Sequence, residues 1–224
     1  MRFSTLKGLL ALLVVVLLAT GCATPKPYDY AAYKQSRPKS VLILPPLNNS
    51  PEVKATYGML AQMSRPLGEA GYYVYPVAVV DETFRQNGLT TSGDIHALPA
   101  AKLRDIFGAD AALYVEVKKY GATYTVFDSA VTVAAEARLV DLKSGQLLWN
   151  GSASASSAEQ NNNNNGGLIG LLVAAVVKQI VHNLSDDSYQ YAGIASQRLL
   201  SPRPNGLLYG PRSPLYGQDG APAQ

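Results

Sequence analysis

The first 22 residues constrain this chain more than any other stretch, because they decide the compartment in which it folds. Two basic residues are followed by an apolar run over residues 9–19 and then by small residues up to Gly21. A basic start, a short apolar run and small residues before a cut are typical of a secretory signal peptide. The run is shorter than the ~20 apolar residues of a transmembrane helix. We therefore expect residues 1–21 to be a signal peptide that is cleaved between Gly21 and Cys22.

Cys22 is the only cysteine of the 224 residues, so the exported chain has no pair of thiols for a disulfide. Hydrophobic residues make up 47% of the chain, which is enough for a packed core. The formal net charge is +3, and two of the cations lie in the expected signal peptide. The exported part is therefore close to neutral, and we expect no nucleic-acid partner.

The stretch Leu18-Ala19-Thr20-Gly21-Cys22 resembles the lipobox of bacterial lipoproteins, with Ala19 where that motif usually has leucine. The resemblance implies that diacylglycerol is attached to the Cys22 thiol and that the new amino group is acylated after cleavage. About two acyl chains suffice for stable membrane anchoring. The alternative is an ordinary signal peptide followed by a chance cysteine.

Composition divides the exported chain into a body and two tails. Residues 22–39 combine prolines and tyrosines and are predicted to form an extended tether, with one or two tyrosines docked on the fold. Residues 40–200 are predicted to form one domain, interrupted by a flexible asparagine- and glycine-rich insert over 160–167. Residues 201–224 contain five prolines and are predicted to be a disordered tail.

Hydrophobic patterning predicts an α/β fold. The apolar run Val41–Leu44 suits a strand that is covered on both faces. Helical spacing follows from Val53 to Gly71, where Pro66 is expected to kink or split the helix. The expected order is β-α-β-α-α, a three-strand meander within 110–151 and C-terminal helices, which together predict a single three-layer domain with a mixed sheet.

The apolar run over residues 168–177 is too short to span a bilayer. We expect it to pack as a helix on the sheet. A helix for self-association or for the membrane surface is the alternative.

Several stretches of the chain resemble a family of bacterial outer-membrane lipoproteins of unknown function, typified by a meningococcal surface lipoprotein. They are Val41–Ser50, Glu69–Val74, Pro76–Phe84, Gln86–Thr90, Phe107–Ala111 and Leu139–Leu142. The opening strand and the hairpin with Asp141 and Gly145 are distantly similar to curli-secretion-channel lipoproteins, to the amino-terminal domain of the Tol translocation protein and to lipoprotein activators of peptidoglycan synthases. The resemblance implies a small α/β fold that binds other proteins, and it carries no catalytic residues.

The residues themselves offer little chemistry for catalysis. His96 and His182 are the only histidines, and both are interpreted as structural. With no second thiol, zinc spacing of the Cys/His type is absent. We therefore expect no enzyme, no metal site and no cofactor beyond the lipid on Cys22.

Asn48 and Asn49 are the best candidates for an interaction loop, because they follow a buried strand and precede a helix. Their alternative role is to form a turn and cap the helix.

These observations predict a lipid-anchored protein of the outer membrane whose domain faces the periplasm, with surface exposure left open. It would be a non-enzymatic binding module, scaffold or accessory factor in envelope assembly, secretion or transport. Its partners would be envelope proteins, other lipoproteins or a second copy that pairs through the edge of the meander. The alternative is a subunit of a curli-channel-like secretion pore, with residues 121–138 as membrane strands.

Overall fold

The computed structural model describes residues 28–124, 129–161 and 184–218. The expected cleavage and acylation site at Gly21 and Cys22 lies outside them. So do most of the 160–167 insert, the apolar run over 168–177 and His182.

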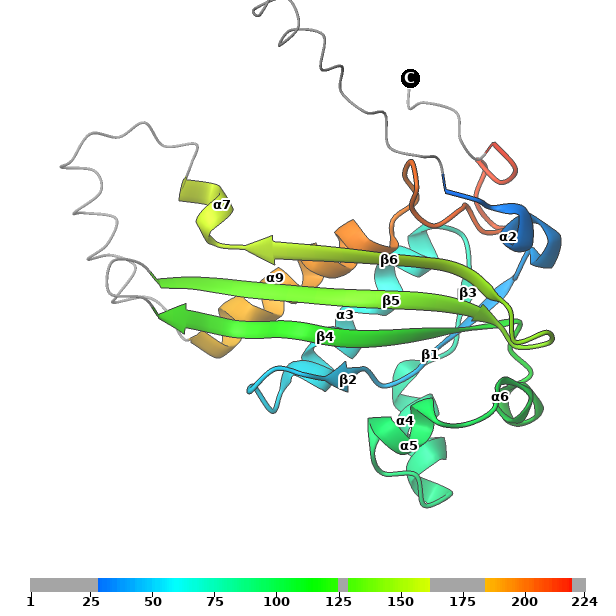
Figure 1. Cartoon of the computed structure of the whole chain (residues 1–224), viewed down its shortest axis with the longest axis horizontal. Helices are drawn as coiled ribbons and strands as arrows, with labels where there is room; N and C mark the ends of the chain where they lie inside the picture. Colours follow the sequence, from blue (N-terminus) through cyan, green and yellow to red (C-terminus); the bar gives the residue numbers. More distant parts are fainter. Residues whose placement is uncertain (1–27, 125–128, 162–183, 219–224) are drawn as a thin grey trace, which may run out of the picture.

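Helices and strands alternate in the first half of the chain, and a three-strand meander follows (Figure 1). The elements are α2 (Ala31–Ser36), β1 (Ser40–Ile43), β2 (Leu47–Asn48), α3 (Ala55–Glu69), β3 (Tyr73–Val74), α4 (Val77–Gln86), α5 (Ser92–His96), α6 (Ala100–Phe107), β4 (Ala111–Tyr124), β5 (Ser129–Asp141), β6 (Leu147–Ser156), α7 (Ala158–Asn161) and α9 (Leu184–Leu200). This order confirms the predicted mixed α/β fold.

One mixed sheet organises the fold. Its strand order is β3-β1-β4-β5-β6, and β2 pairs with β4 beyond the end of β1. Strands β3, β1 and β4 run parallel, whereas β4, β5 and β6 form the antiparallel meander. The prolines at 45 and 46 interrupt the first strand, and pairing with β4 resumes at Leu47, opposite Glu116. The double proline therefore divides one strand into β1 and β2.

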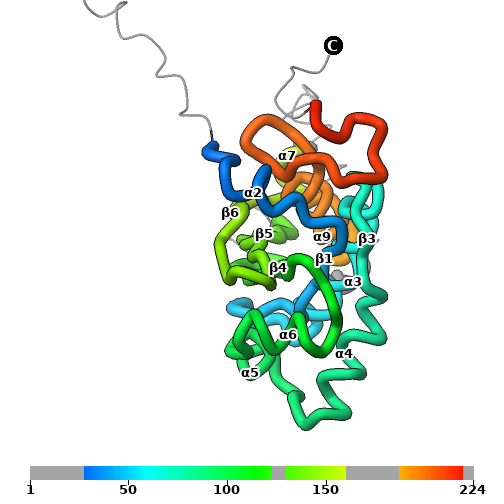
Figure 2. Tube along the Cα trace, turned by 90° about the vertical axis from the view of Figure 1, so that its right-hand side faces the viewer, coloured from blue at the N-terminus to red at the C-terminus, as the bar shows by residue number. Residues whose placement is uncertain are grey.

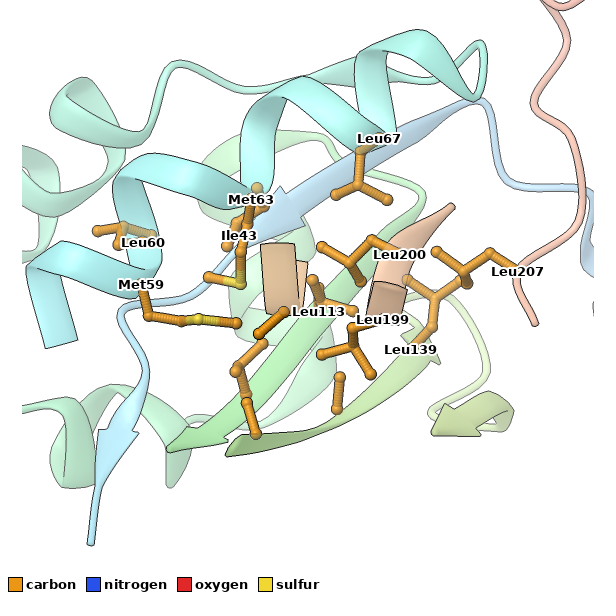
Figure 3. Close-up of a cluster of buried hydrophobic side chains, with 14 of the residues drawn as sticks. Ile43, Met59, Leu60, Met63, Leu67, Leu113, Leu139, Leu199, Leu200 and Leu207 are labelled. Atoms are coloured by element: carbon orange, nitrogen blue, oxygen red, sulfur yellow. The ribbon is translucent and has the colours of Figure 1, made fainter. Parts of the chain in front are cut away.

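Strand β1 is buried on both sides, as its continuous apolar run predicts. Val41 and Ile43 belong to the larger core, which includes residues of α3 and α9. Leu42 and Leu44 belong to a second core shared with α4, α5 and α6. In Figure 3, side chains of α3, α9 and the strands meet in the larger core. The fold therefore has three layers around β1, with the sheet between helices on both of its faces.

The meander is covered on one face only. Helix α9 contacts β4, β5, β6 and α3, and in Figure 1 both helices lie behind the three strands. Helices α4, α5 and α6 lie beside β1 and β2, below the meander. We call the other side of the meander the open face. Its exposed or half-exposed side chains include Glu116, Lys118, Glu136, Arg138, Asn150, Ser152 and Ser154.

Helix α3 differs from expectation at Pro66. It runs unbroken from Ala55 to Glu69 with Pro66 inside it. Pro66 removes one backbone donor, but it stands in the last turn of the helix, and its carbonyl accepts from Ala70 N–H at 2.9 Å. The expected split is therefore wrong, because a proline so close to the end interrupts little of the helix.

The N-terminal segment differs from the extended tether that was expected over residues 22–39. Its described part, from residue 28, contains α2 and is not extended throughout. Tyr33 in this helix is 3% exposed, and its hydroxyl lies 2.7 Å from the hydroxyl of Tyr72. Ser36 donates a hydrogen bond to Asp141 at 2.5 Å, which ties α2 to the turn between β5 and β6. Docking of a tyrosine is confirmed.

The C-terminal segment contradicts the prediction of a disordered tail over 201–224, because residues 201–218 pack on the domain. Leu207 and Leu208 are buried in the larger core. The backbone N–H of Gly210 donates to Ala70 O at 2.8 Å. A Cβ at Gly210 would lie 2.6 Å from the carbonyl carbon of Gly71, so glycine permits this close approach. The prolines and glycines that indicated disorder shape a docked segment instead.

Candidate functional site

The two asparagines of the predicted interaction loop have different roles. Asn48 closes the loop, because its side-chain oxygen accepts from Ser50 N–H at 2.9 Å and its amide donates to Glu52 O at 2.8 Å. The side-chain amide of Asn49 instead reaches across to the carboxylate of Glu116 on β4. Asn48 therefore fits the turn-forming role, while Asn49 borders the open face.

A three-residue ion network stands next to Asn49. Glu116 and Glu136 lie directly opposite each other on β4 and β5, where two like charges repel. Lys118 lies 2.6 Å from Glu116 and 3.3 Å from Glu136, and so neutralises part of this repulsion. The hydrogen bond from Lys118 to Glu116 raises the pKa of the lysine. Lys118 therefore keeps its positive charge at neutral pH.

A β-bulge in β4 places Lys118 in this network. The register with β5 shifts between Val117 and Lys119, so Lys118 is the extra residue. Strict alternation would place Tyr120 on the open face, but the shift pairs it with Val133, and both belong to the larger core. The bulge thus buries Tyr120 and leaves two lysines together in the exposed part of the strand.

A small cleft of about 80 Å³ opens beside the network. Its lining residues are Leu47, His96, Tyr114, Val115, Glu116, Glu136, Ala137 and Arg138. The guanidinium of Arg138 lies 5.3 Å from the ring centroid of Tyr114, in cation–π contact. The His96 ring meets the same tyrosine edge-on at 5.3 Å. The cleft is therefore lined by aromatic rings and by charged groups of both signs.

His96 and Tyr114 are neutral at physiological pH. Burial lowers the pKa of His96, and burial raises the pKa of Tyr114. His96 Nε2–H donates to the carbonyl oxygen of Pro45 at 3.0 Å, since a carbonyl can only accept. The hydrogen bond to Pro45 and the ring contact with Tyr114 both give His96 a structural role.

In the three ranges that the structure describes, no cluster of three His, Cys, Asp or Glu side chains could hold a metal ion. Within the same ranges, no helix is both long enough and apolar enough to cross a bilayer.

Comparison with known proteins identifies the family. A family model described as "Putative lipoprotein GNA1162-like" matches residues 28–212. The chain belongs to the GNA1162-like lipoprotein family. The matched range extends to Arg212 and so includes the docked start of the C-terminal segment.

Two comparisons match the chain to lipoproteins of Neisseria meningitidis at more than 50% identity. The chain is 51% identical over 210 residues to "Putative lipoprotein NMB1124/NMB1162", covering 92% of this chain and 97% of that protein. It is 56% identical to the crystal structure of lipoprotein GNA1162, with a TM-score of 0.51 over 64% of this chain and 98% of that chain.

A more remote match is a PelC dodecamer from Paraburkholderia phytofirmans. The identity is 14%, the TM-score is 0.43, and the match covers 72% of this chain and 88% of that chain. A similarity at this level says nothing about the role or the assembly of the GNA1162-like protein.

Sequence reasoning found Asn49 but missed the residues that it faces. The residues of the network and of the cleft were not among the predicted site residues, namely Tyr114, Glu116, Lys118, Glu136 and Arg138. The pairing of Glu136 and Arg138 with β4 depends on a register that involves residues about 20 positions apart. A charged pair at alternate positions of an apolar strand, such as Glu136 and Arg138, is the signal that could have indicated an uncovered face.

Proposed function

We propose that this GNA1162-like protein is acylated at Cys22, anchored in the outer membrane with its domain in the periplasm, and acts as a non-enzymatic binding module in envelope assembly, secretion or transport. Membership in a lipoprotein family supports the anchor. The observation that carries the binding role is the open face, which exposes charged groups beside the loop of Asn49.

The open face has the composition of a protein-binding surface. Arginine and tyrosine are enriched among the residues that contribute most to binding, and here Arg138 lies over Tyr114. Glu136 and Lys118 place both signs of charge nearby, which favours a partner with a complementary pattern. The protein partner proposed is therefore an envelope protein with a polar, charged surface.

We place the proposed pairing with a second copy of the chain at the outer edge of β6, where side chains of the same chain already engage two backbone groups. Ser154 O accepts from Arg198 at 2.8 Å and Ser156 N–H donates to Glu159 at 3.0 Å, so the backbone groups of alternate residues point away from β5. Ser152 belongs to the same series, so its backbone groups also point away from β5. Unpaired strand edges pair readily with another strand. Light scattering of the protein at high concentration tests the dimer, and a monomer at every concentration would contradict it.

Site-specific photo-crosslinking in intact cells tests the binding role. A photoreactive residue in place of Ser152 is expected to trap discrete envelope proteins, because Ser152 is exposed on the open face. The matched control is the same residue in place of Lys102, which is exposed on α6. Adding Arg138→Glu should abolish the adducts at Ser152. Equal adducts at both positions, or adducts that survive Arg138→Glu, would contradict the proposal.

Labelling with radioactive palmitate tests the anchor separately. The wild-type chain is expected to incorporate label and to sediment with outer-membrane fractions, whereas Cys22→Ser should do neither. An unlabelled wild-type protein would remove the anchor from the proposal.

A further inference from the structure

The N-terminal and C-terminal segments meet at one end of the domain and form a basic surface there. Figure 2 looks onto this end, where α2 lies beside the C-terminal segment. Tyr72 joins the two segments, because its hydroxyl lies 2.7 Å from that of Tyr33 and donates to Leu208 O at 2.6 Å. We call this end the terminal surface. It comprises the exposed residues Lys34, Arg37, Lys39, Arg203, Arg212, Tyr73, Leu215 and Tyr216.

The five cations of the terminal surface form no ion pair with any described residue. Four cations elsewhere in the domain do form ion pairs, namely Arg65, Arg85, Lys118 and Arg198.

Two carboxylates near the terminal surface accept hydrogen bonds from backbone N–H groups. Asp110 accepts from the N–H groups of Lys39 and Ser40 at 2.9 and 3.0 Å. Asp141 accepts from Ser144 N–H at 2.7 Å. Both carboxylates keep their negative charge, but neither forms an ion pair with the five cations.

Exposed apolar and aromatic side chains accompany these cations. Leu215 and Tyr216 are 43% and 37% exposed, and Tyr73 is 42% exposed. The guanidinium of Arg37 lies 5.8 Å from the Tyr216 ring centroid, and that of Arg212 lies 5.4 Å from the Tyr73 ring centroid. Tyrosine and arginine with one apolar part and one polar end are favoured at the boundary between lipid and water.

A cavity of about 110 Å³ opens between the two segments of the terminal surface. Lys34 and Arg37 line it together with Tyr209 and Tyr216, and no carboxylate lines it. Two cations around a small opening suit a singly charged phosphate group.

The chain connects this end to the proposed anchor by a short stretch. Tyr28 is fixed to the C-terminal segment, because its N–H donates to the side chain of Asn205 at 3.0 Å. Five residues lie between it and Cys22, and these six steps of extended chain span at most about 20 Å. If Cys22 carries the acyl chains, which is part of the proposed function, the terminal surface stays beside the membrane.

We propose that the terminal surface docks on a membrane that contains anionic phospholipids, with the cations on the headgroup phosphates and Leu215 and Tyr216 in the interfacial layer. The acyl chains would hold the protein at the membrane, and this surface would orient it. The open face, which lies on another side of the domain, would then remain accessible to protein partners.

Vesicle flotation with the chain from residue 22 onward tests this docking, with Cys22→Ser in every protein so that acylation plays no part. The chain is expected to float with phosphatidylethanolamine vesicles that contain about 30% phosphatidylglycerol and to stay unbound with phosphatidylcholine vesicles. Raising the salt concentration from about 0.05 M to about 0.5 M should release it, because salt screens surface charge.

Two charge-matched variants identify the surface. Lys34→Gln with Arg37→Gln and Arg212→Gln should weaken binding to the anionic vesicles about a hundredfold, at roughly fivefold per cation. Lys54→Gln with Lys102→Gln and Arg104→Gln removes the same charge from other exposed positions and should change binding less than twofold by the same reasoning.

Equal losses of vesicle binding in the two variants would show that only the net charge of the protein matters, and would overturn the proposal. Equal binding to both kinds of vesicle, or binding that survives high salt, would also overturn it. The salt series uses the unsubstituted surface, so the test stands even if a triple variant folds poorly. A failure of palmitate labelling would remove the anchor and leave the vesicle result unaffected.

Discussion

Leu139 and Arg138 are neighbours in β5, and they belong to opposite faces of the sheet. Leu139 is 1% exposed in the core beneath α9, whereas Arg138 is exposed and lies over Tyr114. The same alternation runs along the strand, with Ala135 and Ala137 buried on one side and Glu136 exposed on the other. One strand thus serves stability on one face and recognition on the other, so substitutions on the two faces should have different effects.

Leu139→Ala should have the largest effect on stability. It removes a buried side chain from a closely packed core, and such truncations cost about 2–5 kcal/mol of the free energy of unfolding. Urea denaturation monitored through Trp149, which is buried nearby in the same core, measures the change. A loss below about 1 kcal/mol would mean that the covered face does not hold the fold together as described.

Gly58→Ala tests how closely α3 packs on the covered face. An added Cβ would overlap the Tyr120 hydroxyl and lie 2.9 Å from Tyr120 Cζ. We expect a loss of about 1–3 kcal/mol from overpacking, despite the better helix propensity of alanine. The control is Gly68→Ala in the same helix, where nothing lies within 4 Å. It should stabilise the fold by up to about 1 kcal/mol, and equal effects at both positions would be inconsistent with the contact.

Arg138→Gln should leave stability nearly unchanged while weakening partner binding on the open face. Exposed substitutions usually change the free energy of unfolding by less than about 0.5 kcal/mol. The crosslinks from Ser152 should nevertheless decrease, since the cation over Tyr114 is lost. A change in stability as large as that of Leu139→Ala would place Arg138 among the residues that hold the fold.

His96→Gln should produce the smallest effect, visible only in the pH dependence. Burial lowers the pKa of His96 in the folded state, so the unfolded chain takes up a proton first as the pH falls below about 6.5. The stability that neutral His96 contributes is therefore present above this pH and is lost as the pH falls toward the pKa of the folded state. The stability difference between the wild-type protein and His96→Gln should narrow from pH 7.5 to pH 5. A constant difference would show that His96 does not titrate within the cleft.

Local patterns in the sequence were sufficient for much of the fold. The continuous apolar run at 41–44 predicted a strand covered on both sides, and the helical spacing from Val53 predicted the helix that ends before Gly71. Gly108 ends α6 in the left-handed conformation that glycine tolerates. These features depend on residues that are neighbours in the chain, so the sequence alone determined them.

Contacts between distant residues decided the rest. Alternation along β4 and β5 separates two faces, but which face is covered depends on α9, more than 40 residues later in the chain. The bulge at Lys118 appears only against the register of β5, and the order of residues 201–218 depends on the backbones of Ala70 and Gly71. Proline and glycine indicate where a chain departs from helix and strand. Only the tertiary structure shows whether the departing segment packs, because packing depends on the surface that it meets.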